Sequence, residues 1–195
     1  MTKGFEFYFD FVSPYSFLAH QEIKKIEKKF SIKIKYMPIL LGGLHNLHGI
    51  KAPAFIPSKA KFMIRDCKMV AEKNKIKFKF NSYFPIKTLN LMRGVLIAQE
   101  DDFKNFYIDK IFDAIWKDGL NMNDQNIIDK VLKNIEVNPK TFLLRSATLN
   151  IKTLLKKKTD EAYERGIFGA PTFLVNNKIF WGQDRLEYAL IEAKK

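Results

Sequence analysis

The tetrapeptide Ser13-Pro14-Tyr15-Ser16 combines residue types that can stabilise a negative charge. A serine suited to capping a helix is followed by a proline suited to the first helical turn. The backbone N–H groups of that turn have no partner within the helix and lie at the positive end of its dipole. The Ser13 hydroxyl and the N–H groups of Tyr15 and Ser16 could therefore present donors to an anion or a thiolate. The alternative is that Ser13 only caps its helix.

The tetrapeptide lies where a strand pattern gives way to a helical one. Every second residue from Phe5 to Phe11 is phenylalanine, which is typical of a strand with one buried face. Helical spacing then predicts a helix from about Pro14 to Lys29, and alternation predicts a second strand from Ser31 to Met37. Two strands joined by such a helix are expected to pair in parallel through a right-handed crossover. The chain is therefore expected to open with a βαβ unit.

The middle of the chain is expected to form a long loop followed by a run of helices. From Leu40 to about Lys59 it is rich in Gly, His, Asn and Pro, which predicts a long surface loop. Residues 58–165 read as successive helices, apart from a short strand-like alternation at residues 76–80. The expected helices are Ala60–Asn74, Ile86–Glu100, Asp102–Lys117, Asn123–Asn134, Lys140–Ser146 and Thr148–Arg165.

Strand patterns return near the C-terminus. Residues Thr172–Val175 and Lys178–Trp181 flank Asn176-Asn177, an arrangement that favours a hairpin with a tight turn. A last helix should open at Gly182 and Gln183, and we expect Leu186, Leu190 and Ile191 on its buried side. The element order is thus βαβ, a run of helices, then ββα.

Composition and charge exclude several classes of protein. The 195 residues contain one cysteine, so no Cys-x-x-Cys pair can form and dithiol redox chemistry is not expected. We interpret Cys67, within an apolar helical pattern, as a structural residue. The net charge of +13 is spread along the chain, and only five of the 34 basic residues are arginine, which argues against a nucleic-acid partner.

Two further classes are not expected. No apolar run is long enough for a membrane span, and the first strand follows the initial Met almost at once, which indicates a cytoplasmic protein without a leader. His45 and His48 are spaced like metal ligands, but no nearby Cys or acidic residue completes a set, so no metal is expected.

This element order resembles a thioredoxin-like α/β fold that carries a large all-helical insertion. The resemblance assigns residues 1–57 and 166–195 to the thioredoxin-like domain and residues 58–165 to the insertion. Ser13-Pro14-Tyr15-Ser16 takes the place of the Cys-x-x-Cys of redox members, and the segment from Gly166 to Phe173 resembles their cis-proline segment. These two segments and a third, from Phe180 to Leu186, occur in the order found in the 2-hydroxychromene-2-carboxylate isomerase family. Through them the chain closely resembles that family, whose members are relatives of the kappa-class glutathione transferases.

The resemblance also implies roles for single residues. Ser13 would donate a hydrogen bond to the sulfur of glutathione, which favours the thiolate and lowers the thiol pKa. The remaining implied glutathione contacts are Pro14, Tyr15, Lys59, Ala170, Pro171, Gln183 and Asp184. The cofactor would then supply the sulfur that the protein lacks.

Within this set, Ala170 would offer its backbone to the tripeptide if Pro171 is cis. Asp184 would pair with the γ-glutamyl ammonium, and Lys59 with a carboxylate. The alternatives stay open: Pro171 as an ordinary strand-entry proline, Gln183 and Asp184 as helix caps, and Lys59 as a surface lysine.

The implied activity is a glutathione-dependent isomerisation. In the family reaction, thiolate adds reversibly to ring-opened 2-hydroxychromene-2-carboxylate, a bond rotates, and elimination releases trans-o-hydroxybenzylidenepyruvate. The implied partners are glutathione, a small anionic electrophile and a second copy of the chain in a homodimer. Ile50 departs from the pattern, because relatives often carry an Asn there. Glutathione conjugation or peroxide reduction of kappa type, and a non-catalytic thiol- or peptide-binding module, are the alternatives.

Overall fold

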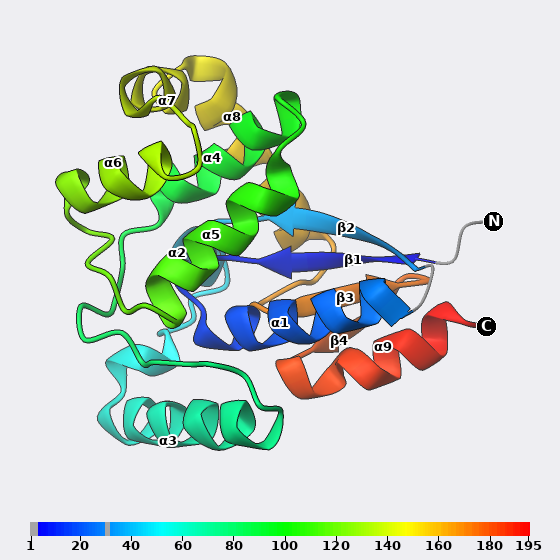
Figure 1. Cartoon of the computed structure of the whole chain (residues 1–195). Coiled ribbons are helices and arrows are strands. Elements are labelled where there is room, and N and C mark those ends of the chain that lie inside the picture. Colours follow the sequence, from blue (N-terminus) through cyan, green and yellow to red (C-terminus); the bar gives the residue numbers. More distant parts are fainter. Residues whose placement is uncertain (1–3, 30–31) are drawn as a thin grey trace.

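The computed structural model of the chain describes residues 4–29 and 32–195, which contain one mixed four-stranded sheet (Figure 1). The strands lie in the order β2-β1-β3-β4. β1 pairs with β2 in parallel, while β1 with β3 and β3 with β4 are antiparallel. The strands are β1 (Gly4–Phe9), β2 (Lys33–Pro38), β3 (Thr172–Val175) and β4 (Lys178–Trp181).

The opening βαβ unit is confirmed. Helix α1 (Pro14–Lys29) connects β1 to β2, and Phe7 lies opposite Tyr36 in the parallel pair. Ser31, where the second strand was expected to begin, lies outside the described residues. The phenylalanines of β1 share one buried face, where Phe7 stacks against Phe173 of β3 with ring centroids 5.6 Å apart.

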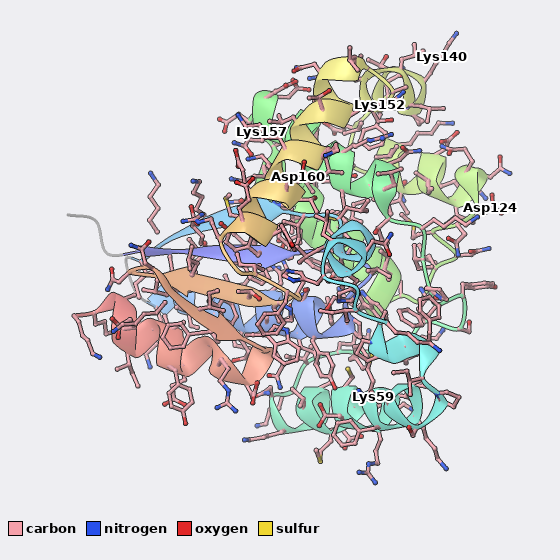
Figure 2. All side chains as sticks on the ribbon, turned by 180° about the vertical axis from the view of Figure 1, so that it is seen from behind. Lys59, Asp124, Lys140, Lys152, Lys157 and Asp160 are labelled. Carbon is pink, nitrogen blue, oxygen red and sulfur yellow. The ribbon has the colours of Figure 1, made fainter. Side chains whose placement is uncertain are left out.

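The two faces of the sheet pack against different helices. In Figure 1, α1 and α9 (Leu186–Ala193) lie in front of the sheet, whereas α8 (Leu149–Glu164) lies in front of it in the reverse view of Figure 2. Tyr8 faces the α8 side and joins a small apolar cluster with Leu44 and Ala162. Both faces of the sheet are therefore covered at the inner strands β1 and β3, which fits an α/β fold of thioredoxin type.

The run of helices expected between the two halves is present. It comprises α3 (Pro57–Lys73), α4 (Leu89–Glu100), α5 (Lys104–Trp116), α6 (Gln125–Lys133), α7 (Pro139–Ser146) and α8. The alternation at residues 76–80 does not form a strand; Phe78 and Phe80 pack on Trp116 instead, with ring centroids 6.1 and 5.6 Å away. In the described part of the chain, no helix is long and apolar enough to cross a membrane.

The division into two domains stays a prediction. One apolar core cluster contains residues of both segments, and the rings of Phe9 and Phe112 lie 5.7 Å apart.

The expectation of an irregular loop from Leu40 to Lys59 is wrong in part. This segment contains α2 (Leu41–Leu47) and a short 3₁₀ helix, η1 (Pro53–Phe55). Gly and Asn disfavour helix in isolation, but Leu44 is fully buried against the sheet, and the Asp10 carboxylate accepts the N–H of Leu41 at 2.8 Å. Tertiary packing and a distant capping group therefore outweigh local propensity.

The C-terminal ββα segment is confirmed with two corrections. Asn176 and Asn177 have φ of 47° and 61°, as the hairpin turn requires. The chain then forms a 3₁₀ helix, η2 (Gln183–Arg185), before α9. Leu186 is buried as expected, but Ile191 is 54% exposed, because the buried stripe of α9 runs through Ala189 and Ala193.

Candidate active site

Ser13 lies at the junction of β1 and α1 and is only 5% exposed. Its hydroxyl oxygen accepts the N–H of Ser16 at 3.1 Å, the geometry of an N-cap, and Pro14 is the first helical residue. The same hydroxyl donates to the carbonyl oxygen of Ala170 at 2.9 Å. The N–H of Tyr15 makes no hydrogen bond to any described residue. The first turn of α1 thus keeps a free donor beside the Ser13 hydroxyl.

Ala170 and Pro171 come from the other half of the chain. The Ala170–Pro171 peptide is cis, and Pro171 is buried at the start of β3. The carbonyl of Pro171 accepts the N–H of Gly182 at 3.0 Å, while the N–H of Ala170 bonds to none of the described residues. Gly182 has φ of 111°, a conformation open to glycine, so that the chain can turn from β4 into η2. The backbone of Ala170 remains available to an extended ligand.

A cavity of about 530 Å³ opens over this junction. A volume of this size suits a small-molecule ligand. Five of the predicted site residues line it: Ser13, Pro14, Tyr15, Lys59 and Ala170. Apolar side chains that sequence reasoning did not select form most of the remaining wall, among them Leu41, Ala54, Phe62, Met63, Phe84, Ile86 and Trp181. The cavity is therefore a mainly apolar space, with polar groups that include Ser13 at the start of α1 and Lys59 at the start of α3.

Lys59 lies in the first turn of α3, where its side chain is exposed (Figure 2). Among the described residues it has no ion-pair partner, although it lines the cavity. Its charge can therefore meet a carboxylate that enters from solvent.

Gln183 and Asp184 do not line the cavity. They form the 3₁₀ turn η2, and the Asp184 carboxylate, 56% exposed, pairs with Arg185 at 3.1 Å. Gly182 links this turn to Pro171, so the two residues lie next to the cis-proline segment without entering the cavity. Their expected role in ligand binding stays a prediction.

The surroundings of Tyr15 and Cys67 keep both side chains protonated. The phenol of Tyr15 donates to the Asp66 carboxylate at 2.8 Å. Burial, followed by the neighbouring Cys67 and Asp66, raises the pKa of Tyr15. Burial likewise raises the pKa of the Cys67 thiol, which is fully covered. A thiol that stays protonated is a poor nucleophile, in agreement with a structural role for Cys67.

Asp10 is the residue that sequence reasoning missed. It is fully buried in the cavity wall, and its carboxylate accepts the hydroxyl of Thr88 at 2.6 Å and the N–H groups of Leu41 and Val12 at 2.8 and 3.1 Å. These donors come from the starts of α4 and α2 and from the turn before α1. Burial raises the pKa of Asp10, and the three hydrogen bonds oppose that rise. A carboxylate at the end of a phenylalanine-rich strand was the available signal.

His45 and His48 lie in different surroundings. His45 lines the cavity, whereas the ring nitrogen Nε2 of His48 lies 2.9 Å from the carbonyl oxygen of Ile167. Within the described residues, no three His, Cys, Asp or Glu side chains gather in a metal-binding group.

The fold and the junction between Ser13 and the cis-proline define a thioredoxin-type protein. The model of the DSBA-like thioredoxin domain family matches residues 5–190, and the chain belongs to that family. It is 28% identical over 190 residues to 2-hydroxychromene-2-carboxylate isomerase of Sphingobium xenophagum, covering 96% of each chain. It is also 26% identical over 195 residues to glutathione S-transferase kappa 1 of Caenorhabditis elegans, covering 92% of this chain and 86% of that protein.

A solved structure supports the same placement. The structure of a 2-hydroxychromene-2-carboxylate isomerase superposes with a TM-score of 0.87 at 23% identity, covering 98% of this chain and 94% of that one. At this identity the superposition establishes the fold. The predicted resemblance to these isomerases and to kappa-class transferases is confirmed.

Proposed function

We propose that this protein is a glutathione-dependent isomerase of the 2-hydroxychromene-2-carboxylate type. The observation that carries the proposal is the buried Ser13 hydroxyl, at the first turn of α1 and beside Ala170, opening into an apolar cavity. The similarity to named isomerases over 96% of the chain supports this reaction class.

Several groups in and beside the cavity support glutathione as the cofactor. The free N–H of Tyr15 and the Ser13 hydroxyl would favour a charged sulfur, because donors to an anion lower the pKa of the group that carries it. The free N–H of Ala170 would hold the peptide as an added strand does. Lys59 would receive a carboxylate of glutathione or substrate. Asp184, which lies outside the cavity beside the cis-proline segment, would receive the γ-glutamyl ammonium.

When bound, glutathione would supply a thiolate whose reversible addition to the conjugated substrate permits a bond to rotate. The protein's own residues would then act by placement and by charge. Ser13 would hold the negative charge on sulfur, and the apolar wall at Phe62 and Phe84 would hold a flat substrate and exclude water. None of these residues needs to change oxidation state, which fits a chain with one covered cysteine.

Turnover with a thiol-blocked cofactor tests the proposal. The protein should isomerise 2-hydroxychromene-2-carboxylate with glutathione and show only background turnover with S-methylglutathione, which keeps the peptide and loses the reactive thiol. Equal rates with the two peptides, or no rate above the enzyme-free control, would overturn it. Glutathione conjugation of 1-chloro-2,4-dinitrobenzene without isomerisation would indicate the kappa-type alternative. Glutathione binding without turnover of either substrate would indicate a binding module. The expected homodimer stays a prediction.

A further inference from the structure

A second hollow, of about 610 Å³, lies between α2, α4 and α8. It shares Leu40 and Leu89 with the wall of the Ser13 cavity, but neither Ser13 nor Ala170 lines it. The two spaces therefore adjoin each other at these two leucines. Nothing in the proposed isomerase chemistry uses the second one.

The cations of this hollow are only partly neutralised. Arg93, Lys152 and Lys156 line it together with one carboxylate, that of Asp160, and Lys156 pairs with Asp160 at 2.5 Å. Among the described residues, neither Arg93 nor Lys152 has an ion-pair partner. The hollow thus presents two uncompensated positive charges.

Arg93 is the less ordinary of the two. It is partly buried, and its Nε atom is shielded from solvent without a hydrogen-bond partner in the described structure. Its one side-chain hydrogen bond there is from Nη1 to the amide oxygen of Asn90, at 3.2 Å. Burial lowers the pKa of Arg93, as expected for a cation that loses water and gains no anion. A guanidinium in this state can gain from an anionic ligand, and its planar fork matches a carboxylate.

The rest of the wall is mainly apolar, although Asn46, Thr153 and Thr159 also line it. Leu40, Leu47, Leu89 and Leu155 supply most of it, from the start of α2 to the middle of α8. A bare inorganic anion would leave these side chains without a partner. An apolar body with a carboxylate at one end would cover the leucines and meet the cations.

We infer that the hollow between α2, α4 and α8 is a second ligand site, for a small amphipathic carboxylate whose acid group meets Arg93 and Lys152. The apolar part of the ligand packs on the leucines, including the two that also line the Ser13 cavity. The inference does not depend on the isomerase activity.

The test uses 2-naphthoate as the carboxylate probe, 2-naphthamide as its uncharged counterpart and inorganic phosphate as a bare anion. Calorimetry with the full chain should show naphthoate binding at least tenfold more tightly than either of the others, because a charge-assisted hydrogen bond is worth about that factor or more. Amide chemical shifts should move at Gly43 and Lys152. Equal affinity for naphthamide, or for phosphate, would overturn the assignment.

Matched variants locate the site. Lys152→Met should weaken naphthoate binding severalfold, whereas Lys157→Met should not, since Lys157 lies on the other side of α8 (Figure 2) and pairs with Glu161. Arg93→Lys, which keeps the charge and loses the fork, should weaken binding less than Arg93→Met. Thermal melts identify any variant that does not fold. If Arg93→Met does not fold, Lys152→Met still tests the site, because Lys152 is exposed and its substitution should leave the fold intact. If Lys59→Met no longer binds naphthoate while Lys152→Met binds it as tightly as wild type, naphthoate lies in the Ser13 cavity. That result would overturn the inference.

Discussion

The Ser13 hydroxyl donates a 2.9 Å hydrogen bond to the carbonyl oxygen of Ala170, a residue 157 positions further along the chain. This bond joins the first turn of α1 to the cis-proline segment in the wall of the cavity. Because a hydroxyl has one proton, Ser13 cannot serve Ala170 and a thiolate at the same time. If Ser13 binds sulfur, its hydroxyl must rotate away from Ala170, while its oxygen can still cap Ser16.

Replacing Asp184 with Ala tests the distal end of the proposed glutathione site. An interfacial charge pair with the γ-glutamyl ammonium should cost about 2 kcal/mol on truncation, or roughly thirtyfold in affinity. Asp118→Ala is the control, because Asp118 is exposed after α5 and does not line the cavity. Equal glutathione affinities of the two variants by calorimetry would leave Asp184 with only its pair to Arg185, which is exposed and worth little.

Asp10→Asn should change the pH dependence of stability. Burial raises the pKa of Asp10 in the folded chain, so the folded state keeps its proton at a pH where the unfolded state has lost it. The free energy of unfolding of the wild type should therefore fall as pH rises from about 4 through the raised pKa. The variant lacks this titration and also loses an acceptor for the N–H of Leu41, at a cost of about 1–3 kcal/mol.

The variant should thus be less stable than wild type at low pH, with a gap that narrows as pH rises. Urea unfolding in pH steps measures both curves, and Asp118→Asn provides an exposed control. Parallel curves for wild type and Asp10→Asn would show that Asp10 titrates alike in the folded and unfolded chains.

A pair of glycine substitutions tests the packing of the helices around α4. A Cβ at Gly94 would collide with the hydroxyl of Tyr107 and the ring of Phe142, so Gly94→Ala should destabilise the fold by about 1–3 kcal/mol. Gly42, in α2, has nothing within 4 Å of its Cβ position, so Gly42→Ala should be stabilising by up to about 1 kcal/mol through helix propensity. Thermal melts that rank the two variants in the opposite order would contradict this packing.

Much of the fold could be predicted because its local signals agree with one another. The alternating phenylalanines of β1, the Ser13 cap and the asparagine turn each predicted an element that the structure contains. Helix α2 was missed because its stability comes from contacts distant in sequence, with Asp10 capping Leu41 and the sheet covering Leu44. Ile191 was misplaced because neighbouring apolar residues on α9 compete for the same buried stripe.

The candidate site likewise contains residues that sequence motifs predict and residues that only the structure reveals. Ser13 and Ala170 follow from motifs near two ends of the chain, and the structure brings them together. The role of Asp10 depends on donors from Leu41 and Thr88, which no spacing in the sequence connects. The apolar residues of the cavity wall likewise come from several separate segments, so they could be identified only from the folded structure.

The most direct test of the proposed role of Ser13 is the pKa of glutathione bound to wild type and to Ser13→Ala, followed by ultraviolet thiolate absorbance. Loss of one donor to an anion is worth about 1.5–3 kcal/mol, so the thiol pKa in the complex should rise by roughly one to two units in the variant. Because Ser13 also caps Ser16, melts without ligand should show a separate loss of about 1 kcal/mol. An unchanged thiol pKa together with a lower melting temperature would mean that Ser13 is only a helix cap, and would contradict the proposed mechanism.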